Sequence, residues 1–150
     1  MTIQVDTREK ARAIKSVLAE FEKQGILHIS SKLYVGDYMS LDNPRVVIDR
    51  KQNLLEIASN LIQQHDRFIN EINRANAAGI KIIFLIEHGK NIKSLDDVEK
   101  WQNYRCKESK FAVSGERLYK MLSVLKTRYE IDFEFCEKKD TGAKIIELLR

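Results

Sequence analysis

Several kinds of segment are missing from this chain of 150 residues, and each absence narrows the range of protein classes. Only two cysteines occur, Cys106 and Cys136, so the sequence has neither a Cys-x-x-Cys pair nor a dense disulfide framework. No apolar run approaches the roughly 20 residues that span a bilayer, and the charged N-terminus does not resemble a signal peptide. We therefore expect an intracellular protein with reduced thiols and no membrane contact.

Proline is also scarce, since the single Pro44 lies in a turn-like Asp42-Asn43-Pro44 sequence, and charge of one sign is not abundant. The net charge is +4 and the pI is near 9.0. This small excess of positive charge is compatible both with binding to a polyanion such as nucleic acid and with an ordinary solvated basic surface. With 43% hydrophobic and 32% charged residues, the composition is that of a globular protein, and the length indicates one domain over residues 1–150.

Hydrophobic periodicity predicts strands alternating with amphipathic helices. We expect strands over residues 2–5, 26–33, 35–41, 45–51, 80–87 and 131–136, with the third and fourth forming a hairpin. We expect helices over residues 8–25, 53–63, 66–79, 94–106, 114–129 and 141–150, with a break near His65. The order predicts an α/β fold with a mixed central sheet flanked by helices.

Charged side chains stand at the ends of the predicted strands. Asp6 and Arg8 follow the first strand, and Asp37 lies near the start of the third. The fourth strand ends on Asp49, Arg50 and Lys51, where alternation places Asp49 and Lys51 on one face about 7 Å apart. The hairpin would bring Asp37 beside them.

Two neighbouring carboxylates repel each other unless a proton or a cation lies between them, and Mg²⁺ suits such a pair. A lysine beside them can orient or deprotonate water and neutralise an anionic transition state. This is the chemistry of metal-dependent phosphodiester cleavage. Because Asp-x-Lys is a common sequence, a surface salt-bridge cluster at the hairpin is the alternative interpretation.

The stretches "VDTRE", "VGDY" and "VIDRK", followed by the helix "LLEIASNL", resemble the nuclease domain of the XPF-type structure-specific endonucleases in the PD-(D/E)XK superfamily. The resemblance continues through "DRFINEI" and "IIFLIE" to the end, so that it covers essentially all 150 residues. It implies a restriction-endonuclease-like fold. The helix-hairpin-helix and helicase domains that other members carry do not fit in this length.

The resemblance also implies a function: a DNA endonuclease that depends on Mg²⁺ or Mn²⁺ and cuts branched or junction DNA, such as flaps and forks, in repair, recombination or phage DNA processing. It implies a homodimer, and the missing domains suggest a targeting partner protein or a phage-encoded version. A Holliday-junction-resolving or restriction-like nuclease, and a non-catalytic DNA-binding or scaffold subunit, are the alternatives.

The resemblance implies roles for individual residues. The metal ligands would be Asp37 and Asp49, with Asp6 as a further acid, and Lys51 would be the catalytic lysine. Arginines near the scissile phosphate, or bracing the carboxylates, would be Arg8 and Arg50, and Arg67 would contact phosphate.

This chain departs from the family pattern at two places. The family has glutamate where Asp49 stands, and its acid four residues after the lysine is replaced by Leu55. Glu56 takes that role if the loop is one residue longer, and Glu20 on the first helix is another candidate acid, although its position favours solvent.

Two further features are candidates for DNA contact. His65, between the break and Arg67, is the histidine expected nearest to DNA. The basic segment 87–117 contains Lys90, Lys107 and Lys110 together with aromatic residues, and it either follows a DNA backbone or forms a solvated helix with its aromatics packed inward.

Overall fold

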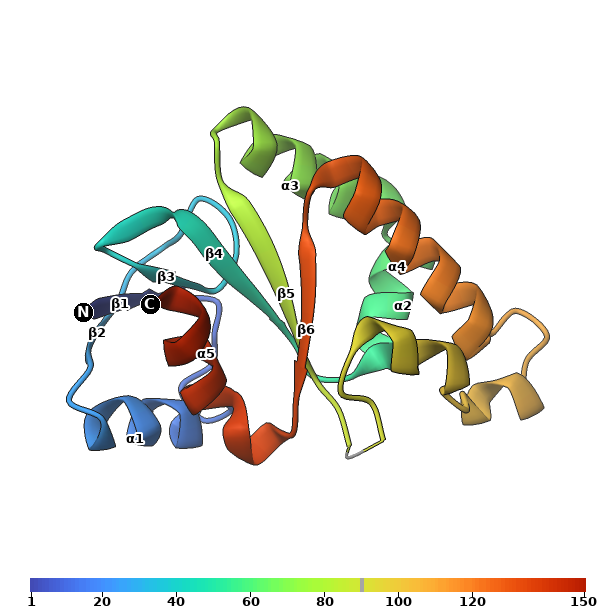
Figure 1. Cartoon of the computed structure of the whole chain (residues 1–150), viewed down its shortest axis with the longest axis horizontal. Helices are drawn as coiled ribbons and strands as arrows, with labels where there is room; N and C mark the ends of the chain where they lie inside the picture. The colour runs from blue at the N-terminus through green and yellow to red at the C-terminus, as the bar shows by residue number, and fades with distance from the viewer. Residues whose placement is uncertain (90) are drawn as a thin grey trace.

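A computed structural model describes residues 1–89 and 91–150, so Lys90 of the basic segment lies outside the described residues. Within these ranges six strands form one mixed sheet in the order β2-β1-β3-β4-β5-β6 (Figure 1). The strands are β1 (Thr2–Val5), β2 (Leu27–Ser30), β3 (Tyr38–Ser40), β4 (Asn43–Lys51), β5 (Lys81–Glu87) and β6 (Asp132–Cys136). β3 runs antiparallel to β1 and β4, and the pairs β1–β2, β4–β5 and β5–β6 are parallel.

The helices cover both faces of this sheet, as Figure 1 shows. They are α1 (Lys15–Lys23), α2 (Leu54–Ile62), α3 (His65–Ala77), α4 (Gly115–Tyr129) and α5 (Thr141–Leu149). α1 and α5 pack on one face, and α2, α3 and α4 pack on the other. The mixed α/β fold predicted from the sequence is confirmed.

β5 shows why the two faces have separate cores. Its residues Ile82, Phe84 and Ile86 belong to the core under α2, α3 and α4, whereas Ile83 and Leu85 belong to the core under α1 and α5. Successive strand residues point to opposite faces, so a continuous apolar run is what a central strand covered on both sides requires.

Two of the expected helices differ from the structure. The first begins at Lys15 instead of residue 8, because Arg8 and Glu9 are held by ion pairs to Asp6 and Arg50 rather than by helical bonds. Tertiary contacts thus override the local helical pattern.

The helix expected over 94–106 is instead two 3-10 helices, Leu95–Lys100 and Tyr104–Lys107. Asn103 lies between them, accepts a hydrogen bond from the Arg105 N–H and donates one to the Val113 carbonyl, so its side chain competes with a continuous helix. The break near His65 is present at residues 63–64, between α2 and α3.

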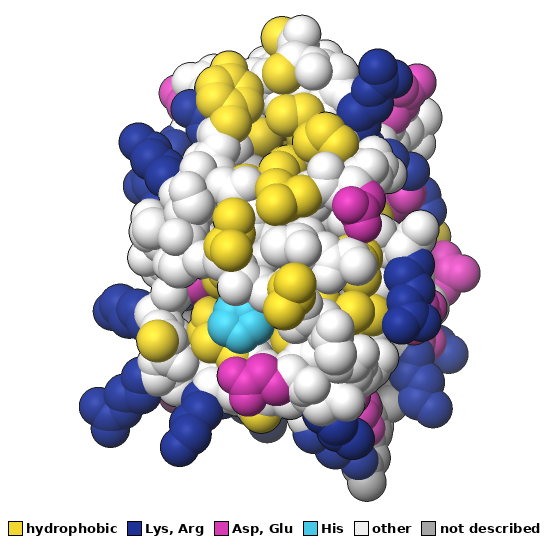
Figure 2. Space-filling view, turned by 90° about the vertical axis from the view of Figure 1, so that its left-hand side faces the viewer, with side chains coloured by type: hydrophobic (Ala, Val, Ile, Leu, Met, Phe, Trp, Pro, Cys, Tyr) yellow, Lys and Arg dark blue, Asp and Glu magenta, His cyan; other side chains and the backbone are white. Residues whose placement is uncertain are grey.

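The edge of the sheet farthest from β6 is formed by β2, and this edge carries exposed apolar side chains. Leu27 is 70% exposed and Ile29 is 45% exposed. Figure 2 shows hydrophobic side chains gathered with a histidine on this face. By contrast, the apolar stripe of α4 is core, since Leu118, Leu122 and Leu125 are buried under the sheet.

Neither cysteine is in a disulfide: Cys106 is exposed, and Cys136 is half-buried at the end of β6. Among residues 1–89 and 91–150, no helix combines the length and the apolar character needed to cross a bilayer.

Candidate active site

A cleft of about 270 Å³ opens where β4 ends, between the turn that precedes β3 and the helices α2 and α3. Most of the side chains that line it are charged or polar: Arg8, Glu9, Asp37, Asp49, Arg50, Lys51, Gln52, Glu56, Asn60, Gln64, Arg67, Phe68 and Glu71. Charged residues that follow β1, precede β3 and end β4 therefore meet in one cleft.

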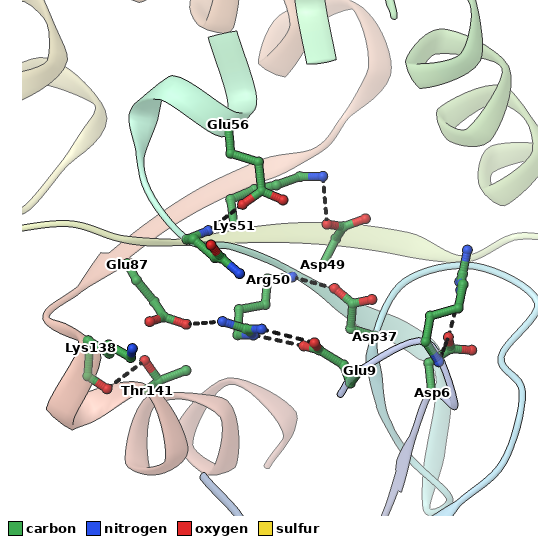
Figure 3. Close-up of polar contacts among 12 residues, drawn as sticks. Asp6, Glu9, Asp37, Asp49, Arg50, Lys51, Glu56, Glu87, Lys138 and Thr141 are labelled. Carbon is green, nitrogen blue, oxygen red and sulfur yellow. Dashed lines mark hydrogen bonds and ion pairs between the residues drawn. The ribbon is translucent and has the colours of Figure 1, made fainter. Parts of the chain in front are cut away.

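The end of β4 supplies residues that alternate between the two faces of the sheet. Lys51 Nζ lies 3.1 Å from Asp49 Oδ1, and both side chains are on the α2 side of the strand (Figure 3). The same ammonium lies 5.9 Å and 5.8 Å from the ring centroids of Phe68 and Phe84. Arg50 points to the opposite face. Asp49 and Lys51 thus share a face, as the alternation predicts.

Asp37 reaches the same region from the turn before β3. Gly36 has a φ of +76°, and a Cβ added to it would lie 3.0 Å from Val47 Cγ2, so only glycine lets this turn approach β4 so closely. The Asp37 N–H donates to the Ile48 carbonyl at 2.8 Å, and Asp37 Oδ2 accepts from the Arg50 N–H at 2.8 Å. These bonds fix the Asp37 carboxylate beside the end of β4.

The two aspartates are held in an environment that disfavours their ionised forms. Burial raises the pKa of Asp37, and the negative charges of Asp49 and Glu9 raise it further. Burial also raises the pKa of Asp49, although Lys51 opposes this. Burial alone would lower the pKa of Lys51, but the neighbouring carboxylates outweigh it and raise that pKa. Without a further cation, this pair therefore tends to keep a proton.

Arg50 is a bracing residue on the other face of β4. Its Nε and Nη2 donate to the two oxygens of Glu9 at 2.7 Å and 2.9 Å, and its Nη1 donates to Glu87 at 2.6 Å. The Arg50 side chain is only 6% exposed. Of the two roles expected for it, the structure shows contacts with carboxylates, while Arg50 also lines the cleft and its DNA contact stays a prediction.

Asp6 is a second bracing residue in this structure, and its place among the metal ligands stays a prediction. Its Oδ2 accepts from the Arg8 N–H at 2.9 Å and from Arg8 Nε at 2.6 Å, and its Oδ1 accepts from the Leu33 N–H at 2.7 Å. Burial would raise the pKa of Asp6, but these hydrogen bonds outweigh it and lower that pKa. Asp6 does not line the cleft, whereas Arg8 does and is 54% exposed.

Glu56 is the acid that follows Lys51 in the cleft. Asn53 Oδ1 accepts from the Glu56 N–H at 2.9 Å and caps α2, and Glu56 Oε2 accepts from the Gln52 N–H at 2.6 Å. This first helical turn directs the Glu56 carboxylate into the cleft, and Leu55 is not among the lining residues. The acid after Lys51 is therefore Glu56, one residue later than the family pattern places it.

Carboxylates outnumber cationic side chains in the lining of the cleft, five to four. Arg8 and Arg50 already pair with carboxylates, which leaves Lys51 and Arg67 to offset the rest. The remaining carboxylates are Asp37, Asp49, Glu56 and Glu71. A phosphate entering this cleft would be repelled unless a cation accompanied it.

Arg67 lies in the cleft as expected, but His65 does not. Arg67 and Glu71 occupy the cleft side of α3, whereas His65 and Ile69 lie in a hollow between α3 and α4. Helical residues two positions apart differ by about 200° around the axis, so His65 and Arg67 cannot face the same groove. The DNA contact expected of His65 would therefore not be made through this cleft, and it stays a prediction.

Three other candidates also lie away from the cleft. Glu20 packs against α5, where a Cβ added to Gly142 would lie 2.7 Å from that of Glu20. Lys107 is in the second 3-10 helix, and Lys110 Nζ lies 5.3 Å from the ring centroid of Phe111. Glu20, Lys107 and Lys110 are not among the lining residues, so the acid role considered for Glu20 and the DNA contacts of the lysines stay predictions.

Some aromatic side chains of the basic segment 87–117 pack inward, as a solvated helix requires, and others are exposed, as contact with DNA requires. Trp101 is partly buried against the core, whereas Tyr104 is 58% exposed and Phe111 is 80% exposed.

Three glutamates of the site were not identified from the sequence. Glu9 directly follows Arg8 in "VDTRE", and Glu71 stands one helical turn after Arg67, which are spacings that place each beside a predicted site residue. Glu87 ends β5, the strand next to β4, so its position at a shared sheet edge was the available signal.

A model of the ERCC4 domain family matches residues 5–149. XPF from Aeropyrum pernix is 20% identical with a TM-score of 0.67, and its complex with DNA gives 22% and 0.69. These matches cover 99% of this chain but only 64% and 63% of the XPF chains, so this chain spans less than two-thirds of their length. Comparison with curated proteins gives no match. Because the family model omits only residues 1–4 and 150, the chain belongs to the ERCC4 domain family.

Proposed function

We propose that this chain is a divalent-metal-dependent DNA endonuclease that hydrolyses phosphodiester bonds in branched or junction DNA. The observation that carries the proposal is the geometry at the end of β4, where one cleft gathers Asp37, Asp49 and Lys51, with Lys51 paired to Asp49. Membership of the ERCC4 domain family and the fold shared with XPF bound to DNA support it.

The donor set fits a hard cation such as Mg²⁺, with Mn²⁺ as a substitute. Among the described residues, no group of three His, Cys, Asp or Glu side chains could hold a metal ion alone. Asp37 and Asp49 would therefore supply two oxygen ligands, and water and substrate phosphate would supply the others, which is the usual way proteins bind Mg²⁺. When bound, the cation would offset the carboxylates and act as a Lewis acid on the phosphate.

The chain's own side chains then have separate tasks. The neighbouring carboxylates favour the ammonium form of Lys51, so Lys51 would donate hydrogen bonds to the attacking water or to a phosphoryl oxygen and offset negative charge. Arg67 would bind a phosphate oxygen, because it lines the cleft and the described residues give its side chain no ion pair. Arg8, whose Nε is held by Asp6, would present the rest of its guanidinium to the DNA backbone.

A panel of labelled DNA structures tests the proposal. Flaps, forks, four-way junctions and plain duplex are incubated with the protein, with and without Mg²⁺. We expect cleavage of flaps or forks that requires the metal, and little cleavage of duplex. Exclusive cleavage of four-way junctions or duplex would favour the resolving or restriction-like alternative. Absence of cleavage from the whole panel would contradict the proposal.

Titration calorimetry with Mg²⁺ separates an enzyme from a scaffold subunit. An enzyme should bind Mg²⁺ through Asp37 and Asp49, whereas a scaffold that has no use for the metal should give no heat. The homodimer and the targeting partner also stay predictions. Sedimentation equilibrium of the purified chain measures the first, with a mass twice 17.5 kDa as the expected result.

A further inference from the structure

A second hollow, of about 230 Å³, continues from the cleft along α3. It shares Arg8, Arg67 and Glu71 with the cleft and extends to Asn70 and Arg74. Three of these five lining residues are arginines, so the positive charge that the cleft lacks is concentrated here. A chain of phosphates that leaves the cleft on this side would pass along the arginines.

An aromatic side chain stands at the rim, paired with the last of these arginines. The Arg74 guanidinium carbon lies 4.8 Å from the ring centroid of Tyr34, and Arg74 Nη2 donates to the Tyr34 carbonyl at 2.8 Å. Tyr34 nevertheless remains 58% exposed. The guanidinium thus covers part of the ring, and enough of the residue is open to solvent for another planar group to stack on it.

The backbone around Tyr34 is anchored on both sides, although its side chain is exposed. Leu33 and Val35 are buried, the Leu33 N–H donates to Asp6, and the carbonyl of Gly36 accepts from Arg8 Nη2 at 3.3 Å. The ring is therefore presented from a fixed loop that leads directly into Asp37. An exposed aromatic ring on a fixed loop loses little conformational freedom when it binds a planar ligand.

We propose that Tyr34 and Arg74 form a stacking platform for an unpaired base of the DNA substrate, while Arg8 and Arg67 bind the phosphates between this base and the cleft. The inference rests on the proposed function, since it assigns the single-stranded flank of a junction to one side of that site. Stacking on aromatic rings beside cationic side chains is how proteins hold single strands without reading their sequence. A base inside a duplex is already stacked on both faces, so duplex DNA could use only the arginines.

The test is a binding measurement without metal, so it does not depend on cleavage. Fluorescence anisotropy follows the binding of a labelled oligothymidylate of about 12 nucleotides, and of a duplex, in the presence of EDTA. Y34A should weaken single-strand binding about 5- to 150-fold and change duplex binding less than about twofold. Y34F keeps the ring and should bind like wild type. L27A removes an exposed apolar side chain of β2, outside both hollows, and should also bind like wild type.

Opposite outcomes overturn the platform. They are an equal loss on single strand and duplex, a loss by Y34F as large as by Y34A, a loss by L27A as large as by Y34A, or no measurable binding of the oligonucleotide by wild type. Because Y34A could disturb the loop, photocrosslinking of wild type to the same oligonucleotide carrying 5-iodouracil provides an independent measurement. The crosslinked peptide should contain Tyr34, and crosslinks found solely elsewhere would refute the assignment.

The two proposals fail separately. A protein that holds single strands through Tyr34 but cleaves nothing in the DNA panel would retain the platform and lose the nuclease function. A protein that cleaves junctions with unchanged single-strand binding in Y34A would retain the nuclease function and lose the platform.

Discussion

Replacing Asp37 by asparagine should make the metal-free protein more stable, although it removes a residue of the proposed active site. Asparagine has nearly the same shape, and its Oδ1 can still accept the hydrogen bond from the Arg50 N–H. The change removes the repulsion between Asp37 and Asp49 and the burial of a charge, which are the causes of the raised pKa.

The sign of this change in stability follows from the number of protons that the folded and unfolded states bind. The pKa of Asp37 in the folded protein is raised above the value of about 3.9 that it has in an unfolded chain. Between these two values the folded state holds more protons than the unfolded state, so the free energy of unfolding of wild type falls as pH rises through this window. The gain from D37N is therefore small near pH 4 and reaches its full size above the raised pKa.

The burial of Asp37 also limits the size of the gain in stability. Asp37 is partly exposed, so solvent screens part of the effect, and a net contribution equivalent to one or two pKa units corresponds to about 1.4–2.7 kcal/mol. For a protein of this length, each kcal/mol raises the Tm by about 2–4 °C. Thermal unfolding in EDTA at about pH 5 and about pH 8.5 measures the gain at each pH.

Mg²⁺ should reverse the order of stability of D37N and wild type. Wild type should gain stability from Mg²⁺ at the higher pH, because the ion binds the folded state, and D37N should gain much less. D42N is the matched control, because the Asp42 side chain is 73% exposed at the hairpin and should show neither effect. If D37N were less stable than wild type at high pH, or if Mg²⁺ stabilised both equally, the reasoning about a repulsive pair would be wrong.

The bracing residues and the phosphate contacts give three further predictions. R50M should lower the free energy of unfolding by about 3–5 kcal/mol in urea titrations, because it leaves Glu9 and Glu87 without their cation; a change below about 1 kcal/mol would contradict this. G36A should cost at least about 1 kcal/mol in the same assay, since alanine is strained at a φ of +76° and its methyl group would crowd β4; an unchanged midpoint would refute the requirement for glycine. R67A should reduce the salt dependence of duplex binding by about one unit of slope, and an unchanged slope would exclude a phosphate contact.

Much of the fold was predictable because the period of the apolar residues differs between strands and helices. The shared face of Asp49 and Lys51 followed from strand alternation, and the hairpin pattern placed Asp37 beside them. Both depend on local geometry that a sequence specifies directly.

The errors occurred where tertiary contacts decide the conformation. Treating residues 8–25 as one helix concealed Glu9, which the chain turns back toward Arg50. Nothing in the local sequence of Asp6 reveals the hydrogen bond that its carboxylate accepts from the distant Leu33. The side of α3 that faces the cleft could not be predicted without knowing the packing against α4, so the sequence does not show that Arg67 and His65 line different hollows.

The most direct test of the account is single-turnover cleavage of a junction substrate by K51A, with DNA binding measured in parallel. The account predicts a folded protein that binds DNA within about threefold of wild type and cleaves at least about 100-fold more slowly. K126A, which removes an exposed lysine of α4, should cleave normally. Full metal-dependent cleavage by K51A would contradict the assignment of this cleft as the active site.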